Sequence, residues 1–165
     1  PLLTHSLAFR SGAVAAAVEA VRTGATIYTD VKMLAAGINR RITERFGCRV
    51  VCALDQPDVA TRAEADGITR SRAAFETLGH DLDGALIAVG NAPTALLAVL
   101  DMIKDGRAAP ACIIGMPVGF VQARESKERL YQSDTPYVTL RGFRGGSALA
   151  AAAINAIRVL AEADA

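Results

Sequence analysis

Three segments of the sequence place glycine and polar residues directly after an apolar run, an arrangement from which a ligand site can be built. They are Gly90-Asn91, Gly115-Met-Pro-Val-Gly119 and Gly142 to Ser147. If each apolar run is a strand of a parallel sheet, the three segments lie together at the edge where the strands end. None of them has the Gly-x-Gly-x-x-Gly or Gly-x-x-x-x-Gly-Lys-Ser/Thr spacing, so the fingerprint of a nucleotide-binding loop is absent.

The segment Gly90-Asn-Ala-Pro-Thr94 predicts a strand end that turns directly into a helix. Pro93 suits the first helical turn, and Asn91 is a natural N-cap. Gly90 allows the backbone to approach another group closely. We therefore expect free N–H groups of this helix to favour an anionic ligand group.

Charged and hydroxyl side chains accompany these loops. Thr69-Arg70-Ser71 stands at an expected helix start, where the arginine either binds a carboxylate through two hydrogen bonds or is a solvated residue beside an N-cap. Asp30 follows an apolar run at the same edge and either lines the site or caps the next helix. The charge run of Glu125, Lys127 and Glu128 predicts a solvated helix face.

The histidines and cysteines do not form a convincing metal set. His5 and His80 are expected at the surface, where either could exchange protons near neutral pH. Cys48, Cys52 and Cys112 lie in apolar runs and are expected to be small buried hydrophobic residues. Their odd number, without a disulfide framework, fits a reducing cytoplasm.

Alternating apolar and amphipathic segments predict the elements that position these residues. Strands are expected at 25–29, 49–54, 85–89, 111–114 and 137–140, and helices at 12–23, 31–37, 58–65, 69–78, 93–104, 121–130 and 148–161. This order predicts a single α/β domain over residues 1–165: a three-layer α/β/α sandwich with a doubly wound, mostly parallel five-stranded sheet. The last helix is apolar on most sides, so we expect it between helix layers or at a subunit interface.

Composition limits the possible partners. The 165 residues are 52% hydrophobic, and 18 basic against 17 acidic residues give a net charge of +1. This balance does not support nucleic acid or an acidic membrane as a partner. No apolar run approaches the ~20 residues of a transmembrane helix, and no signal peptide is recognisable. Because position 1 is Pro, we expect further native residues before it.

Several segments form a set when they are taken together. They are Thr29-Asp-Val-Lys-Met33 with Ala36-Gly-Ile38, Thr69-Arg-Ser71, Val89-Gly-Asn-Ala-Pro-Thr-Ala-Leu96, Ile114-Gly-Met-Pro-Val-Gly-Phe-Val121 with Glu125-Ser-Lys127, and Arg141-Gly142 with Gly145-Gly-Ser147. This set resembles one family, the precorrin-8X methylmutases of cobalamin biosynthesis. The resemblance covers nearly the whole chain, and the segments occur in the family's order.

The resemblance implies a homodimeric isomerase that needs no cofactor. Such an enzyme moves a methyl group from C-11 to C-12 of precorrin-8X, or of cobalt-precorrin-8, to give hydrogenobyrinic or cobyrinic acid. A macrocycle ringed by carboxylates suits backbone donors, helix N-termini and arginine. The residues expected to bind it are Asp30, Met33, Gly37, Thr69, Arg70, Ser71, Gly90, Asn91, Ala92, Pro93, Thr94, Gly115, Pro117, Val118 and Gly119.

The resemblance also implies an acid/base histidine in a His-x-x-(Gly/Ala)-Asp-like motif, upstream of the segment that matches Leu7 to Val14. Only Pro1 to Ser6 precede that segment, and the residues after His5 do not fit the motif. The catalytic role is therefore left unassigned: either the motif precedes Pro1 in the native protein, or the chain is a corrinoid-binding or carrier domain without turnover. A Rossmann-like nucleotide-binding enzyme is the third, weaker hypothesis.

Overall fold

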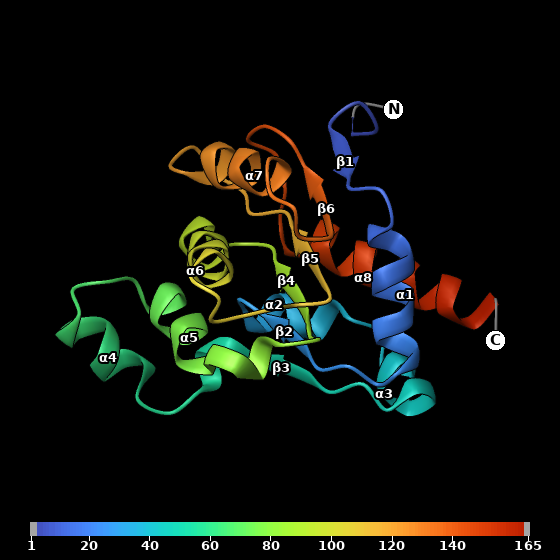
Figure 1. Cartoon of the computed structure of the whole chain (residues 1–165), viewed down its shortest axis with the longest axis horizontal. Helices are drawn as coiled ribbons and strands as arrows, with labels where there is room; N and C mark the ends of the chain where they lie inside the picture. The colour runs from blue at the N-terminus through green and yellow to red at the C-terminus, as the bar shows by residue number, and fades with distance from the viewer. Residues whose placement is uncertain (1–2, 164–165) are drawn as a thin grey trace.

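Six strands form one sheet in the order β1-β6-β5-β4-β2-β3 in the computed structural model, which describes residues 3–163 (Figure 1). The strands are β1 (Leu7–Phe9), β2 (Ile27–Thr29), β3 (Val50–Cys52), β4 (Leu86–Val89), β5 (Cys112–Gly115) and β6 (Tyr137–Leu140). All neighbouring pairs are parallel except β1 with β6, where Leu7 lies opposite Leu140. The mostly parallel sheet is confirmed.

The expected number of five strands is wrong, because β1 was not foreseen. Each of the five expected strands is present, and β1 adds an antiparallel edge. This strand has only three residues, and its outer residues Leu7 and Phe9 are exposed. It therefore lacks the continuous buried apolar run by which the parallel strands are recognised.

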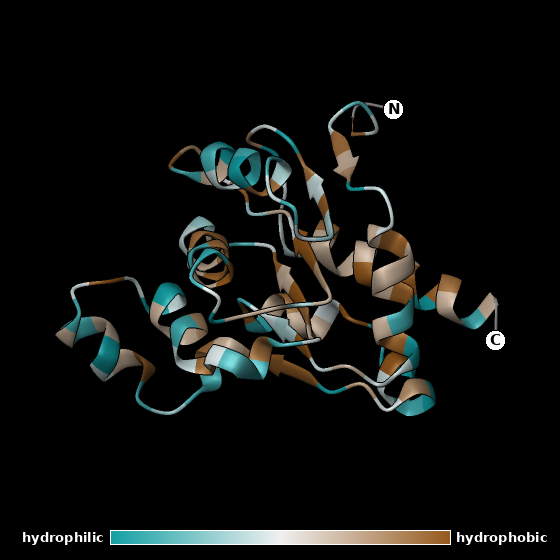
Figure 2. Cartoon of the chain, viewed as in Figure 1, coloured by the Kyte–Doolittle hydropathy of each residue, from teal (hydrophilic) through white to brown (hydrophobic). Residues whose placement is uncertain are grey.

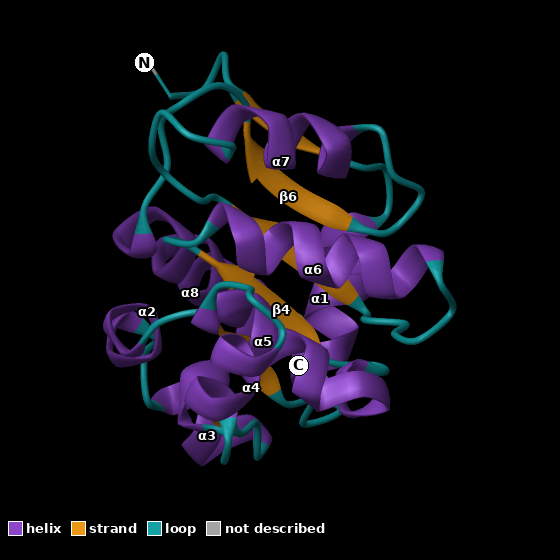
Figure 3. Ribbon diagram, turned by 90° about the vertical axis from the view of Figure 1, so that its left-hand side faces the viewer, coloured by secondary structure: helices purple, strands orange, loops and turns teal. Residues whose placement is uncertain are grey.

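Helices cover both faces of the sheet, so the three-layer architecture is also confirmed (Figures 1 and 3). The longer helices are α1 (Ala13–Arg22), α4 (Val59–Ala65), α5 (Arg70–Leu78), α6 (Pro93–Lys104), α7 (Ala123–Tyr131) and α8 (Ser147–Ala163); α2 (Lys32–Gly37) and α3 (Arg41–Phe46) are short. Two short 3-10 helices, η1 (Ala53–Asp55) and η2 (Gly79–Leu82), complete the elements. Helices α4 to α7 lie on one face, and α1, α2, α3 and α8 lie on the other.

The core consists of two apolar clusters separated by the sheet, and hydrophobic residues gather on the strands and the inner helix faces (Figure 2). Successive residues of β4 contribute to opposite clusters: Ile87 packs beneath α5 and α6, whereas Leu86 and Ala88 face α1 and α8. This alternation is the period-2 geometry of a strand that is covered on both faces.

The chain reverses its direction of travel across the sheet between β2 and β4. From β2 it moves outward to β3, then returns to form β4 on the other side of β2 and continues to β5 and β6. In open α/β sheets the carboxyl ends of two strands at such a switch point are the usual position for a ligand. Here those ends carry Asp30 and Gly90.

Candidate functional site

The loops that follow β4, β5 and β6 meet at one side of the sheet, which we call the carboxyl edge. The N–H of Met116 donates to the carbonyl of Val89 (2.8 Å), and the N–H of Gly146 donates to the carbonyl of Met116 (2.8 Å). The N–H of Gly119 donates to the carbonyl of Phe143 (3.3 Å). The predicted convergence of the three glycine-containing segments is therefore confirmed.

The carboxylate of Asp30 accepts hydrogen bonds at the switch point, where the carboxyl ends of β2 and β4 lie side by side. One carboxylate oxygen accepts the N–H of Gly90 (3.0 Å), and the other accepts the N–H groups of Asn91 and Ala92 (2.7 Å each). The residue is only 1% exposed. Burial raises the pKa of the Asp30 carboxyl above its ordinary value, and the three N–H donors oppose that rise.

This arrangement corrects two expectations. Asp30 does not cap the helix that follows it, because the N-cap of α2 is Val31. The N-cap of α6 is Ala92, without a side-chain hydrogen bond, so Asn91 does not have the predicted capping role. The N–H groups of residues 90 to 92 are donated to Asp30, so they are not free for an anionic ligand.

Two glycines show how closely the loops pack. A Cβ at position 90 would lie 2.6 Å from the Cα of Ser147, and a Cβ at position 145 would lie 2.6 Å from the carbonyl oxygen of Pro117. Because both neighbours are backbone atoms, no side-chain rotation could make room. The base of the carboxyl edge is therefore filled with protein, and a ligand has to lie farther out.

Outside the packed base of the carboxyl edge, a hydrogen bond between two hydroxyl groups joins the start of α5 to the start of α6. The hydroxyl of Thr69 donates to that of Thr94 (2.8 Å) and accepts the N–H of Arg72 (3.2 Å). Thr69 is therefore the predicted N-cap of α5. The adjacent Arg70 is exposed and, among the described residues, makes no ion pair.

The residues expected to bind substrate fall into two groups by exposure. Met33, Gly37, Thr69, Arg70, Ser71, Asn91, Pro93, Thr94, Val118 and Gly119 are partly or fully exposed. Asp30, Gly90, Ala92, Gly115 and Pro117 are buried. The second group can shape the loops, but the surface offered to a ligand belongs to the first.

Lys127 contradicts the prediction of a solvated charge run on α7. It is 0% exposed, and its ammonium donates to the carbonyl of Arg144 (2.5 Å) in the loop after β6. Burial lowers the pKa of Lys127 to about 8. The buried positions of α7 are Ala123, Ser126, Lys127 and Leu130, which are spaced as one helical face. That spacing was the available signal for the burial of this lysine.

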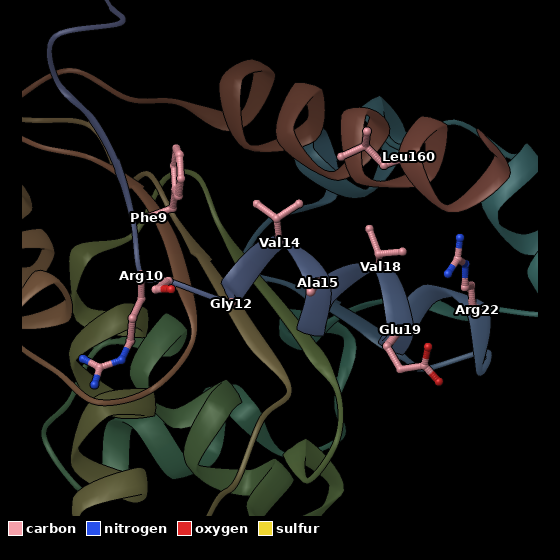
Figure 4. Close-up of a pocket in the computed structure, with 10 residues that line it drawn as sticks. Phe9, Arg10, Gly12, Val14, Ala15, Val18, Glu19, Arg22 and Leu160 are labelled. Carbon is pink, nitrogen blue, oxygen red and sulfur yellow. The ribbon is translucent and has the colours of Figure 1, made fainter. Parts of the chain in front are cut away.

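A separate hollow of about 850 Å³ lies beyond β1, between α1 and α8 (Figure 4). Phe9, Val14, Val18 and Leu160 supply apolar walls, while Arg10, Glu19 and Arg22 add charge. It shares no lining residue with the glycine loops of the carboxyl edge. We therefore do not place the ligand site there.

Within residues 3–163, no group of three or more His, Cys, Asp or Glu side chains could hold a metal ion. No helix in the same part of the chain is both long and apolar enough to cross a membrane.

The cysteines at positions 48, 52 and 112 are buried and unpaired, as predicted.

The fold and the carboxyl edge define a class of protein: an α/β domain with exposed hydroxyl, arginine and apolar groups at the switch point of its sheet, where such domains usually bind a ligand. Comparisons with known proteins narrow this class. The family model described as precorrin-8X methylmutase (CbiC) matches residues 2–160. The chain belongs to the precorrin-8X methylmutase family, which consists of isomerases of cobalamin biosynthesis.

Individual relatives agree with this assignment. The precorrin-8X methylmutase of Pseudomonas aeruginosa is 46% identical over 157 residues, which cover 94% of this chain and 75% of the relative. The cobalt-precorrin-8 methylmutase of Priestia megaterium is 39% identical over 160 residues, or 97% and 71% of the two chains. The crystal structure of the Thermus thermophilus precorrin-8X methylmutase superimposes with a TM-score of 0.90 at 38% identity, covering 98% of this chain and 79% of that one.

Proposed function

We propose that this protein catalyses the isomerisation of precorrin-8X, or of its cobalt counterpart, by moving a methyl group from C-11 to C-12. The product is hydrogenobyrinic acid, or cobyrinic acid for the cobalt form. The family match over residues 2–160 carries this proposal. Because the reaction is intramolecular, the substrate and the product have the same mass.

The carboxyl edge supports the binding part of this reaction. A macrocycle with carboxylates around its rim needs donors at the sides and apolar surface beneath its rings. Arg70 and the Thr69–Thr94 pair supply donors, while the exposed Met33 and Val118 supply apolar surface. By holding one tautomer in a fixed position, these groups lower the entropic part of the barrier. The acid/base residue remains unassigned.

The direct test incubates precorrin-8X and cobalt-precorrin-8, separately, with the protein as its gene encodes it. Conversion should appear as the change from orange to pink, with no change in mass and with the methyl carbon attached to C-12 by NMR. A folded protein that binds hydrogenobyrinic acid but converts neither substrate would instead support the corrinoid-binding alternative.

Replacing Arg70 with alanine should weaken the binding of hydrogenobyrinic acid by about 1.5–3 kcal/mol, as expected for the loss of a charge-assisted hydrogen bond. The affinity can be measured by absorption titration. Arg107→Ala is the matched control, because Arg107 is exposed, pairs with Asp105 and precedes β5 at the opposite edge of the sheet. Equal affinities for the two variants would show that Arg70 is only a solvated residue beside the cap.

We infer that the enzyme is a cytoplasmic homodimer, and two features support this. The three buried, unpaired cysteines fit a reducing compartment. Phe9, which is 58% exposed, lies near Leu160 at the hollow beside β1 (Figure 4), and Val159 is also exposed on α8. Surfaces of this kind are often covered by another subunit.

If the dimer forms through this surface, we expect Phe9→Asp to shift the sedimentation coefficient toward that of a monomer at micromolar protein. A charge at this position would be buried without a partner in the interface. Phe120→Asp is the control, since Phe120 is also exposed but lies in the loop after β5. A dimer that persists with Asp at position 9 and dissociates with Asp at position 120 would place the interface elsewhere.

A further inference from the structure

A small cavity of about 300 Å³ lies at the β6 end of the carboxyl edge. Its walls come from three separate segments: the turn before β1, the first turns of α7 and the loop after β6. The side chains that line it include His5, Arg124, Glu128, Arg141 and Phe143. None of them was among the residues expected to bind substrate.

The antiparallel strand β1 brings the first of these segments to the carboxyl edge. Because Leu7 pairs with Leu140, the residues before β1 lie beside those that follow β6. The N–H of Arg141 donates to the carbonyl of Ser6 (2.8 Å), which fixes this arrangement. His5 therefore lies in the cavity wall although the sequence places it far from the loop after β6.

The cavity carries an excess of positive charge. Glu128 neutralises Arg141 through contacts of 2.8 and 3.1 Å to Nη2 and 3.3 Å to Nε, and the Arg141 guanidinium lies over the ring of Tyr131 at 4.3 Å. Arg124, by contrast, has no carboxylate partner among the described residues. Its guanidinium lies over the ring of Phe143 at 5.8 Å from the centroid.

The cavity adjoins the apolar part of the carboxyl edge. The rings of Phe143 and Phe120 have centroids 6.0 Å apart, and Phe120 is 90% exposed. At about 4.8 Å between neighbouring strands, β4 and β6 end roughly 10 Å apart. A macrocycle held near Thr94, in the first turn of the helix that follows β4, would therefore have part of its rim close to this cavity.

We propose that the cavity is a subsite for a carboxylate on the rim of the macrocycle, and that Arg124 binds it. Arg124 can donate two parallel hydrogen bonds to a carboxylate, which is the geometry that its planar group favours. Phe143 positions the guanidinium from below, and Phe120 contacts the apolar arm that bears the carboxylate. This inference rests on the proposed function, because it takes the ligand to be the corrin substrate or product.

The test compares Arg124→Gln with the unmodified protein in absorption titrations of hydrogenobyrinic acid. Glutamine retains part of the side-chain length over Phe143 but removes the charge. We expect its dissociation constant to rise about 10- to 100-fold, as for a lost charged hydrogen bond. Arg107→Ala again serves as the control and should bind like the unmodified protein.

A second ligand distinguishes the loss of a carboxylate contact from damage to the apolar part of the site. For the methyl ester of hydrogenobyrinic acid, in which every carboxylate is esterified, Arg124→Gln and the unmodified protein should bind with equal affinity. A variant that binds the free acid as tightly as the unmodified protein would overturn the subsite while leaving the proposed function intact. Failure of the unmodified protein both to bind the acid and to convert precorrin-8X would overturn the proposed function and the subsite with it.

Discussion

Replacing Asp30 with alanine should lower the free energy of unfolding by about 3–5 kcal/mol. The carboxylate accepts the N–H groups of Gly90, Asn91 and Ala92, and Gly90 and Ala92 are buried. Each buried donor left without an acceptor costs about 1–3 kcal/mol, whereas Asn91 is exposed and can bind water. The change should appear in urea denaturation as a lower midpoint with an unchanged slope.

Two further variants make this test decisive. Asp30→Asn keeps one acceptor oxygen of similar shape, so its loss of stability should be smaller than that of Asp30→Ala. Asp105→Ala removes an exposed aspartate that pairs with the exposed Arg107, and its effect should stay below about 1 kcal/mol. If Asp30→Ala and Asp105→Ala unfold at the same urea concentration, Asp30 does not hold the loop.

The same carboxylate explains why the N–H groups of residues 90 to 92, just before α6, are not available to an anionic ligand. Gly90, Pro93 and the preceding apolar run were correctly interpreted as a strand that turns into a helix. The sequence could not show that Asp30, 60 residues earlier, is adjacent to that turn. This contact depends on the pairing of β2 with β4, and a strand order is not encoded in local periodicity.

The buried strands could be predicted from the sequence because each is a continuous apolar run. The edge strand β1 could not, because it lacks such a run. A strand covered on both faces is a continuous apolar run, and β4 and β5 are buried at every position. In β1 the two terminal residues are exposed, so its pattern resembles that of an irregular segment. Missing β1 also meant missing the cavity beside Arg141, because β1 is what places His5 there.

Ion pairs between residues far apart in the sequence could not be predicted either. Asp101 on α6 accepts from Arg72 on α5 (2.9 Å) and from Arg129 on α7 (2.7 Å), and so joins three of the four helices on that face of the sheet. Each residue, taken alone, fits a solvated helix face. The three residues form one ion-pair network only because α5 and α7 pack on either side of α6.

The second large expected effect is a pH dependence of the free energy of unfolding that comes from Lys127. Burial lowers the pKa of this lysine to about 8 in the folded protein, against an ordinary value of 10.5. Between these two values the unfolded chain binds the proton and the folded chain does not. The free energy of unfolding contributed by Lys127 should therefore rise with pH from about 8 to about 10.5. At about 1.4 kcal/mol per pKa unit, the rise is of the order of 3 kcal/mol.

The measurement has to be a difference between two proteins, since other groups titrate in the same range. Burial raises the pKa of Cys112 to about 12, and this thiol makes the folded state less stable as the pH rises above about 9. Subtracting the unfolding free energy of Lys127→Met from that of the unmodified protein cancels the cysteine contribution. The remaining curve should rise from about pH 8 to about pH 10.5.

An independent measurement covers the case in which Lys127→Met does not fold. The sequence contains only Lys32, Lys104 and Lys127, so the Cε signals of a protein labelled at lysine can be resolved and assigned with single Lys→Arg variants of the two exposed positions. One signal should titrate near pH 8. If no signal does so, the ammonium of Lys127 is solvated. The bond that joins α7 to the loop after β6 would then not hold the carboxyl edge in place.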